Sequence, residues 1–116
     1  MKNISMKTLK LALQEFPVEG ATFIHWLAET IEARTKYNRI AGGGINFNIV
    51  EIEKAEDQAH KQYENACKKA FEKLEAVNIL YSMAHGGSKF LGNLESFDDK
   101  LQLLELIKDT LFAEAK

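Results

Sequence analysis

One long stretch without a helix-breaking residue constrains the fold of this chain more than any other feature. Between Asn48 and Ala84 the sequence has neither proline nor glycine. Asn48 suits a helix N-cap with Glu51 three residues on, and His85-Gly86-Gly87 suits a left-handed C-cap. At 1.5 Å per residue, roughly 37 residues extend about 55 Å. The sequence therefore predicts one dominant helix that shorter helices must cover.

The remaining breakers divide the rest of the chain into helical segments. A single proline, Pro17, and glycine clusters at 42–44 and 86–92 separate stretches in which apolar residues recur at spacings of three and four. No stretch alternates long enough to predict a strand. Ser96 suits an N-cap with Asp99 at the N3 position. The predicted shorter helices are about Met6–Glu15, a second from between Pro17 and Ala21 to about Asn38, and a third from Ser96 towards the C-terminus.

The long helix has two unlike halves. Residues 51–65 offer only Ile52 and Tyr63 as large apolar groups, which gives a thin seam. Residues 66–84 are richer, and we expect the core to assemble on Phe71, Leu74, Val77, Ile79, Leu80, Tyr81 and Met83. The inner face predicted for the second helix is Phe23, Ile24, Leu27 and Ile31, and that for the last helix is Phe97, Leu101, Leu104, Ile107 and Leu111.

These elements predict an all-α fold, a small antiparallel helical bundle of four helices with one long central helix, in a single domain over 1–116. The 116 residues, 46% of them hydrophobic, suffice for one core. A helix of about 18 residues reaches only roughly 27 Å, so it cannot cover the long helix completely. Either that helix bends, or its partners are staggered, or its polar half protrudes and meets another copy.

Charge and cysteine content exclude several classes of partner. The net charge is −2, from 15 basic and 17 acidic residues, and the densest lysine cluster, 68–73, is interleaved with glutamates. We therefore expect no nucleic-acid binding. No stretch is long enough to span a membrane. The single cysteine, Cys67, cannot form an intramolecular disulfide, which favours a reducing compartment and a cytoplasmic protein.

No residue pattern predicts catalysis, a cofactor or a metal. The three histidines lie on separate elements, without a serine or cysteine at a spacing typical of a nucleophile and base. Asp57 and His60 form a lone acid–histidine pair in the most polar part of the chain, so a solvated face is expected there. Cys67 is followed by Lys68 and Lys69, but a thiol on an apolar helix flank explains it better than an activated one.

The loop containing Gly42, Gly43 and Gly44 leads into a helix N-terminus, where free N–H groups favour an anion. It lacks the Gly-Lys-Ser/Thr ending of a phosphate-binding loop, and Glu51 and Glu53 would repel a phosphate. We expect an interhelical connection here, with anion binding as the alternative.

Two apolar features fit poorly into a monomeric core. At 100° per residue, Leu106 points about 160° away from the inner face of the last helix. In the second helix a stripe containing Trp26 and Tyr37 lies about 100° from the main face. Such residues are favoured interface anchors, although the stripe has the alternative of packing on the first helix or under the glycine-rich loop. The predicted interface residues are Trp26, Tyr37, Ile52, Tyr63 and Leu106.

The function predicted from these patterns is a non-catalytic protein-interaction module, such as an adaptor, inhibitor or regulatory subunit, which self-associates. The alternative from another class is a helical bundle that binds a small anionic ligand or a metal, at Gly42–Gly44 or at Asp57 and His60. The expected partner is another protein or a second copy of the chain.

Overall fold

The computed structural model describes residues 5–42, 49–87, 89–92 and 94–113. These ranges contain four helices and no strand: α1 (Met6–Glu15), α2 (Pro17–Gly42), α3 (Ile49–Ala84) and α4 (Phe97–Ala113). The bounds predicted for the first helix are confirmed. The second helix begins at Pro17 and continues four residues beyond the predicted end at Asn38. The predicted N-cap at Asn48 lies outside the described residues.

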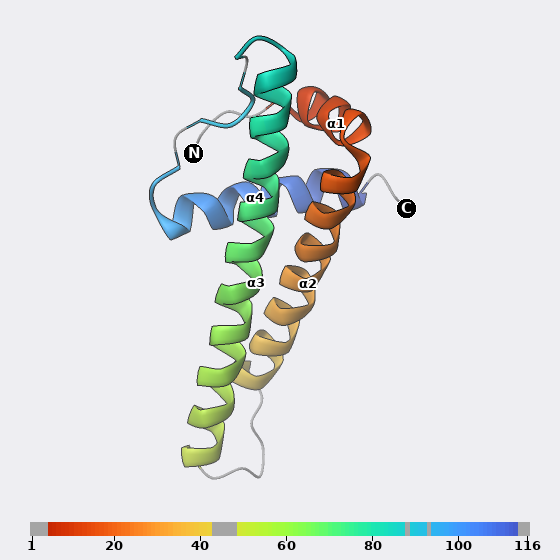
Figure 1. Ribbon diagram of the computed structural model, residues 1–116. Helices are drawn as coiled ribbons and strands as arrows, with labels where there is room; N and C mark the ends of the chain where they lie inside the picture. The colour runs from red at the N-terminus through yellow and green to blue at the C-terminus, as the bar shows by residue number, and fades with distance from the viewer. Residues whose placement is uncertain (1–4, 43–48, 88, 93, 114–116) are drawn as a thin grey trace.

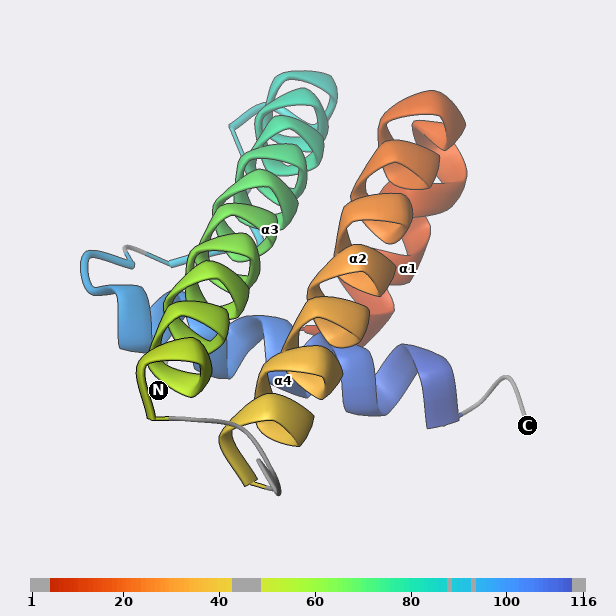
Figure 2. The same cartoon turned by 90° about the horizontal axis from the view of Figure 1, so that it is seen from below.

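The two longest helices form an antiparallel hairpin (Figure 1). The short α1 lies at the end of this hairpin where α2 begins and α3 ends, and α4 crosses one face of α2 and α3 (Figure 2). The predicted all-α bundle with one long central helix is confirmed. Its fourth helix lies across the hairpin rather than antiparallel to it, because the chain first runs back beside α3 before α4 begins (Figure 1).

The helices beside α3 are shorter than α3, and they are staggered along its length. The 26 residues of α2 extend about 39 Å beside the 36 residues of α3, which extend about 54 Å. At the C-terminal end of α3 the chain meets α1, where His85 Nε2 lies 2.9 Å from Glu15 Oε2. The longest axis of the molecule, 57 Å, is therefore close to the length of α3 itself.

The core lies where all four helices meet. Its largest side chains with less than 2% exposure are Phe23, Leu9, Leu27, Leu74, Leu103, Leu104, Ile107 and Val77. Three residues of the predicted spine are not part of it, since Ile79 and Met83 are exposed and Leu80 is half-buried outside the core cluster. For Ile79 the reason is helix geometry. It lies two residues after Val77, so at 100° per residue the two side chains are about 200° apart around the helix and point to opposite sides.

The core face of α4 also differs from the predicted one. Phe97 is 36% exposed, whereas Leu103, which the predicted face omitted, is 1% exposed. Since α4 crosses the hairpin, only the middle of the helix lies over the core, and its first turn extends beyond it (Figure 2). Leu101 and Leu111 are half-buried for the same reason.

The predicted C-cap of α3 and the predicted N-cap of α4 are confirmed. Gly86 and Gly87 have φ values of 71° and 94°, and the Gly87 N–H donates to the Ser82 carbonyl at 2.6 Å. This bond closes the Schellman motif of α3. The Asp99 N–H donates to Ser96 Oγ at 3.1 Å, as expected for the N-cap of α4.

A buried amide fixes the connection between α3 and α4. Asn78 is 5% exposed, and its Oδ1 accepts from the backbone N–H groups of Phe90 at 3.2 Å and Leu91 at 3.4 Å. Phe90 and Leu91 are themselves buried, so the connection contributes to the core. A backbone with buried N–H groups needs such an acceptor, and Asn78 supplies one from within the helix.

None of the helices in the described ranges is both long enough and apolar enough to cross a membrane.

Candidate functional site

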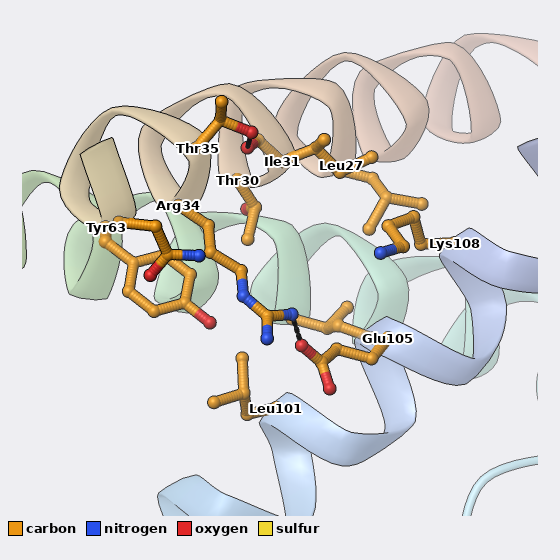
Figure 3. A pocket seen from close by; sticks show the side chains of 11 residues that line it. Leu27, Thr30, Ile31, Arg34, Thr35, Tyr63, Leu101, Glu105 and Lys108 are labelled. Carbon is orange, nitrogen blue, oxygen red and sulfur yellow. Dashed lines mark hydrogen bonds and ion pairs between the residues drawn. The ribbon is translucent and has the colours of Figure 1, made fainter. Parts of the chain in front are cut away.

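A cleft opens between α2, α3 and α4, with a volume of about 290 Å³ (Figure 3). It lies where α4 crosses the hairpin, so each helix contributes part of its wall. The apolar part of the lining comes from Leu27, Ile31, Leu101 and Leu104. The polar part comes from Thr30, Arg34, Thr35, Asn38, Tyr63, Glu105 and Lys108. This combination is typical of a small-molecule site, although its volume lies at the lower end of the range for such sites.

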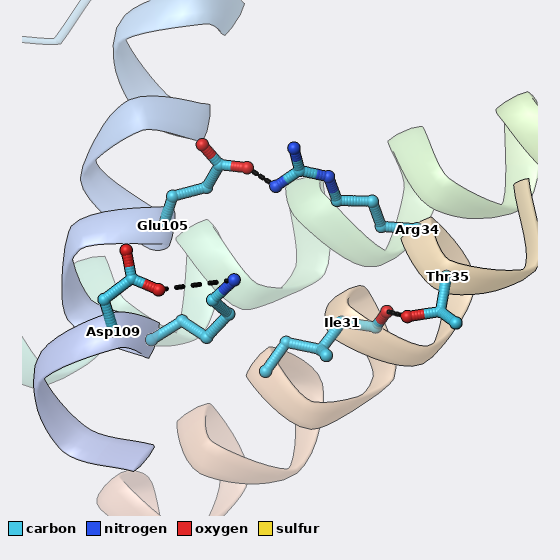
Figure 4. Close-up of polar contacts among 6 residues, drawn as sticks. Ile31, Arg34, Thr35, Glu105 and Asp109 are labelled. Atoms are coloured by element: carbon cyan, nitrogen blue, oxygen red, sulfur yellow. Dashed lines mark hydrogen bonds and ion pairs between the residues drawn. The ribbon is translucent and has the colours of Figure 1, made fainter. Parts of the chain in front are cut away.

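Charged side chains gather on the cleft lining. Arg34 of α2 forms an ion pair with Glu105 of α4 through Nη1 and Oε1, which joins the two helices across the cleft (Figures 3 and 4). Lys108 Nζ also lines the cleft and lies 3.3 Å from Asp109 Oδ1. Since Arg34 and Lys108 are positive and Glu105 is negative, the charged lining residues sum to +1.

The threonines of the cleft direct their hydroxyl protons into their own helix. Thr30 Oγ1 donates to the Trp26 carbonyl at 2.8 Å, and Thr35 Oγ1 donates to the Ile31 carbonyl at 3.0 Å. These oxygens can still accept a hydrogen bond, but their protons are used. Donors for a bound anion therefore come from Arg34, Lys108 and the side-chain amide of Asn38.

Tyr63, in the cleft lining, and Cys67, one helical turn further along α3, form a neutral pair. Burial raises the pKa of Tyr63 to about 12 and that of Cys67 to about 11, and a hydrogen bond links the two side chains. The thiol is buried on the helix flank, as predicted. Because the thiolate is the reactive form, a thiol with a raised pKa is poorly suited to nucleophilic chemistry.

The aromatic stripe predicted on α2 packs within the chain. Trp26 is half-buried against the core, and the ring of Tyr37 stacks on that of Tyr63, with centroids 6.5 Å apart. Tyr63 is 8% exposed, so its side chain is not available to a partner protein. The residues of the glycine-rich loop after Gly42 lie outside the described part of the chain, whereas Tyr37 contacts α3. The reason is that α2 and α3 lie close together along most of α2, so that α2 needs a second apolar face.

The other predicted interface residues have intermediate positions. Ile52 near the start of α3 and Leu106 on α4 are both half-buried. Leu106 therefore does not point fully outward, because α4 crosses the hairpin and its flanks lie closer to the other helices than in an antiparallel bundle.

An exposed apolar patch lies instead on the C-terminal half of α3. Ile79 is 54% and Met83 76% exposed, and they are one helical turn apart. The half-buried Ala76 and Leu80 lie beside them on the same face. We call Ala76, Ile79, Leu80 and Met83 the outer patch. Sequence analysis assigned Ile79 and Met83 to the core, although their angular distance from Val77 was a signal against this.

Among the described residues, the positions predicted for an anion or a metal do not come together in one site. Gly42 is the last residue of α2, whereas Gly43 and Gly44 lie outside the described residues. Asp57 is exposed, and His60 Nε2 lies 3.5 Å from Glu64 Oε1. In the part of the chain that the structure describes, no three His, Cys, Asp or Glu side chains form a group able to hold a metal ion.

The histidines contact carboxylates or aromatic rings. His25 lies edge-on to Trp26 and His60 lies beside Tyr37, with ring centroids 5.4 and 5.5 Å apart. The ring of His85 stacks on Tyr81 at 4.1 Å and contacts Glu15. His85 therefore links the C-terminal end of α3 to α1.

The fold and these surfaces define a small all-α helical bundle with an apolar patch on its longest helix and a positively charged cleft under its last one. Comparisons with protein-family models, with curated proteins and with solved structures gave no match.

Proposed function

We propose that this chain is a non-catalytic protein-interaction module that self-associates through the outer patch of α3. The observation that carries the proposal is the exposure of Ile79 and Met83 on one face of that helix. Contiguous exposed apolar side chains are typical of protein contacts. Methionine suits such a surface because its unbranched side chain adapts to the shape of a partner.

A second copy of the chain is the partner that we expect for the outer patch. In a two-fold pairing, each contact between unlike residues occurs twice, which doubles the gain from a small patch. The patch alone must offset an association cost of roughly 4–15 kcal/mol, so we expect a weak complex, with a dissociation constant of about 1 μM or higher.

Two further parts of the proposal follow from composition. The partner is a protein and not a nucleic acid, because the net charge is −2 and the densest lysine cluster is interleaved with glutamates. The location is the cytoplasm, since the lone Cys67 is a free thiol.

Sedimentation equilibrium tests the self-association. We expect an average mass above that of one chain at about 100 μM, and a lower mass for Met83→Glu and Ile79→Glu. Val50→Glu is the matched control, since Val50 is 60% exposed on the same helix, about 44 Å from Ile79. A wild-type chain that is strictly monomeric at this concentration would reject self-association.

A photo-crosslinking amino acid placed at Met83, and in a second variant at Val50, tests the wider interaction role in cells. The proposal predicts protein adducts from position 83 and fewer from position 50. Absence of adducts from position 83, together with a monomeric chain in solution, would reject the interaction module itself.

A further inference from the structure

The cleft between α2, α3 and α4 has the chemistry of a binding site that the interaction role does not use. In its lining, the half-buried Ile31 and Leu101 offer apolar surface to a ligand, whereas Leu27 and Leu104 are each 1% exposed and belong to the core. The charged groups Arg34, Glu105 and Lys108 occupy the side where α2 faces α4 (Figure 3). A ligand that fills this cleft therefore needs one apolar end and one polar end.

The net charge of the cleft lining determines whether the polar end of the ligand should be positive or negative. The charged lining residues sum to +1, although the whole chain has a net charge of −2. Asp109, the partner of Lys108, does not line the cleft, and its side chain is 71% exposed. Because water screens so exposed a pair, Lys108 keeps most of its attraction for a second anion.

Arg34 already binds a carboxylate, that of Glu105 (Figure 4). The contact engages Nη1, and a guanidinium has five N–H donors in a planar fork, so donors remain for another acceptor. An incoming carboxylate has two ways to bind: beside Glu105 on the remaining donors, or in place of Glu105. In both cases Glu105 opposes binding through like charge.

The volume limits the size of the ligand. A cleft of about 290 Å³ lies at the lower end of the range for small-molecule sites, so we expect a small ligand.

We propose that the cleft binds a small organic monocarboxylate with a short apolar chain or ring. The apolar end lies against Ile31 and Leu101, and the carboxylate lies between Arg34 and Lys108. This site is distinct from the glycine-rich loop, and it is independent of the outer patch.

Titration of the isotopically labelled full chain, followed by amide chemical shifts, tests the proposal with hexanoate as the probe. Hexanamide supplies the same chain without the charge, and acetate supplies the charge without the chain. We expect saturable shifts for hexanoate at residues of the cleft, with a dissociation constant of about 1 mM or below. The affinities for hexanamide and acetate should be at least about tenfold weaker.

Substitutions of the rim give opposite expectations, which a general loss of fold cannot imitate. Lys108→Gln should weaken hexanoate binding about tenfold, because it removes a charge-assisted hydrogen bond. Glu105→Gln should strengthen it, because it removes the competing carboxylate from Arg34. Lys61→Gln, at an exposed lysine on α3 outside the cleft lining, is the matched control and should leave the affinity unchanged.

Three outcomes would overturn the proposal: no saturable shift at about 10 mM hexanoate, equal affinity for hexanamide, or weaker binding by Glu105→Gln. Shifts confined to residues outside the cleft would overturn it as well. Met83→Glu should bind hexanoate like the wild type, so failure here and failure of the outer patch are separate results.

Discussion

At the scale of single residues, three buried polar side chains have roles that their sequence neighbours do not reveal. Asn78 accepts two backbone hydrogen bonds from the connection that follows α3. Tyr63 and Cys67 hydrogen-bond to each other inside the hairpin and stay protonated. Such groups are retained inside a core only when they are satisfied or neutral, which is the case for all three.

Replacement of Asn78 by alanine should lower the free energy of unfolding by about 1–3 kcal/mol, because it leaves the buried N–H groups of Phe90 and Leu91 without their acceptor. Urea denaturation followed by circular dichroism measures this change. The matched control is Asn65→Ala, at an exposed asparagine on the same helix, which should change stability by less than about 0.5 kcal/mol. Equal effects of the two substitutions would contradict the role given to Asn78.

Alkaline pH should destabilise the fold through Cys67 and Tyr63. Burial raises the pKa of Cys67 from 9.0 to about 11 and that of Tyr63 from 10.0 to about 12. Both acids are neutral when protonated, so their stabilising contribution is complete below the unfolded pKa and is lost as pH rises through the folded value. The free energy of unfolding should therefore fall between about pH 9 and pH 12.

The comparison of variants isolates this effect from the lysines, which titrate in the same range. A chain with both Cys67→Ala and Tyr63→Phe should lose stability less steeply with pH than the wild type. Val77→Ala weakens the core but keeps both titrating groups, so its slope should match that of the wild type. If the double variant and the wild type have the same slope, the two buried groups do not cause the decline.

At the scale of elements, α1 and α2 pack closely because one residue has no side chain. A Cβ on Gly20 would lie 3.1 Å from the Leu13 carbonyl oxygen and 3.2 Å from Leu13 Cδ2. The nearest atom belongs to the backbone of α1, which moves less easily than the end of a side chain. Gly20 therefore serves the approach of the two helices, although glycine weakens the first turns of α2.

Gly20→Ala should fail to give the gain of about 1 kcal/mol that alanine has over glycine within a helix, since the new methyl group crowds α1. Gly20→Val should destabilise the chain by about 1–3 kcal/mol through overpacking. Thermal and urea unfolding both report the difference. Gly42→Ala provides the matched control at the end of the same helix, where a Cβ meets nothing within 4 Å, and should not destabilise. If Gly20→Ala stabilised the chain, this would show that α1 moves easily to make room for the methyl group.

At the scale of the whole molecule, the hairpin of α2 and α3 gives an elongated shape. The principal extents are 57 × 32 × 24 Å, and the radius of gyration is 16.3 Å. A chain of this length in a spherical fold has a radius of gyration of about 13 Å. The shape leaves much surface for the size of the core, and this surface includes both the outer patch and the cleft.

Small-angle X-ray scattering at low concentration should give a radius of gyration between about 16 and 18 Å for the monomer, which includes its hydration layer. A value near 13 Å would contradict the extended hairpin. The radius should increase with concentration for the wild type if the outer patch self-associates, whereas Met83→Glu should keep the monomer value throughout.

The sequence by itself determined the elements of this protein. Helix bounds and caps are local properties, because they depend on periodicity and on residues within a few positions of each other. The predicted bounds of α1, the Ser96 cap of α4 and the glycine C-cap of α3 were therefore correct. The burial of Cys67 was also predicted from its position on an apolar flank.

Only the tertiary structure decided which faces meet. A helix with apolar residues on two faces does not specify which partner each face contacts, so the sequence left open whether the stripe of Trp26 and Tyr37 is an interface or packs within the chain. In the structure Trp26 packs against the core and Tyr37 stacks on Tyr63 of α3. Ile79 and Met83 were assigned to the core but lie on the surface, and this difference was visible in the sequence, because both residues point away from Val77 on the helix. The cleft, in contrast, depends on the angle at which α4 crosses the hairpin, since this crossing brings Glu105 to Arg34 from a distant part of the chain. No local pattern encodes that angle, because it results from the packing of all the side chains between the helices.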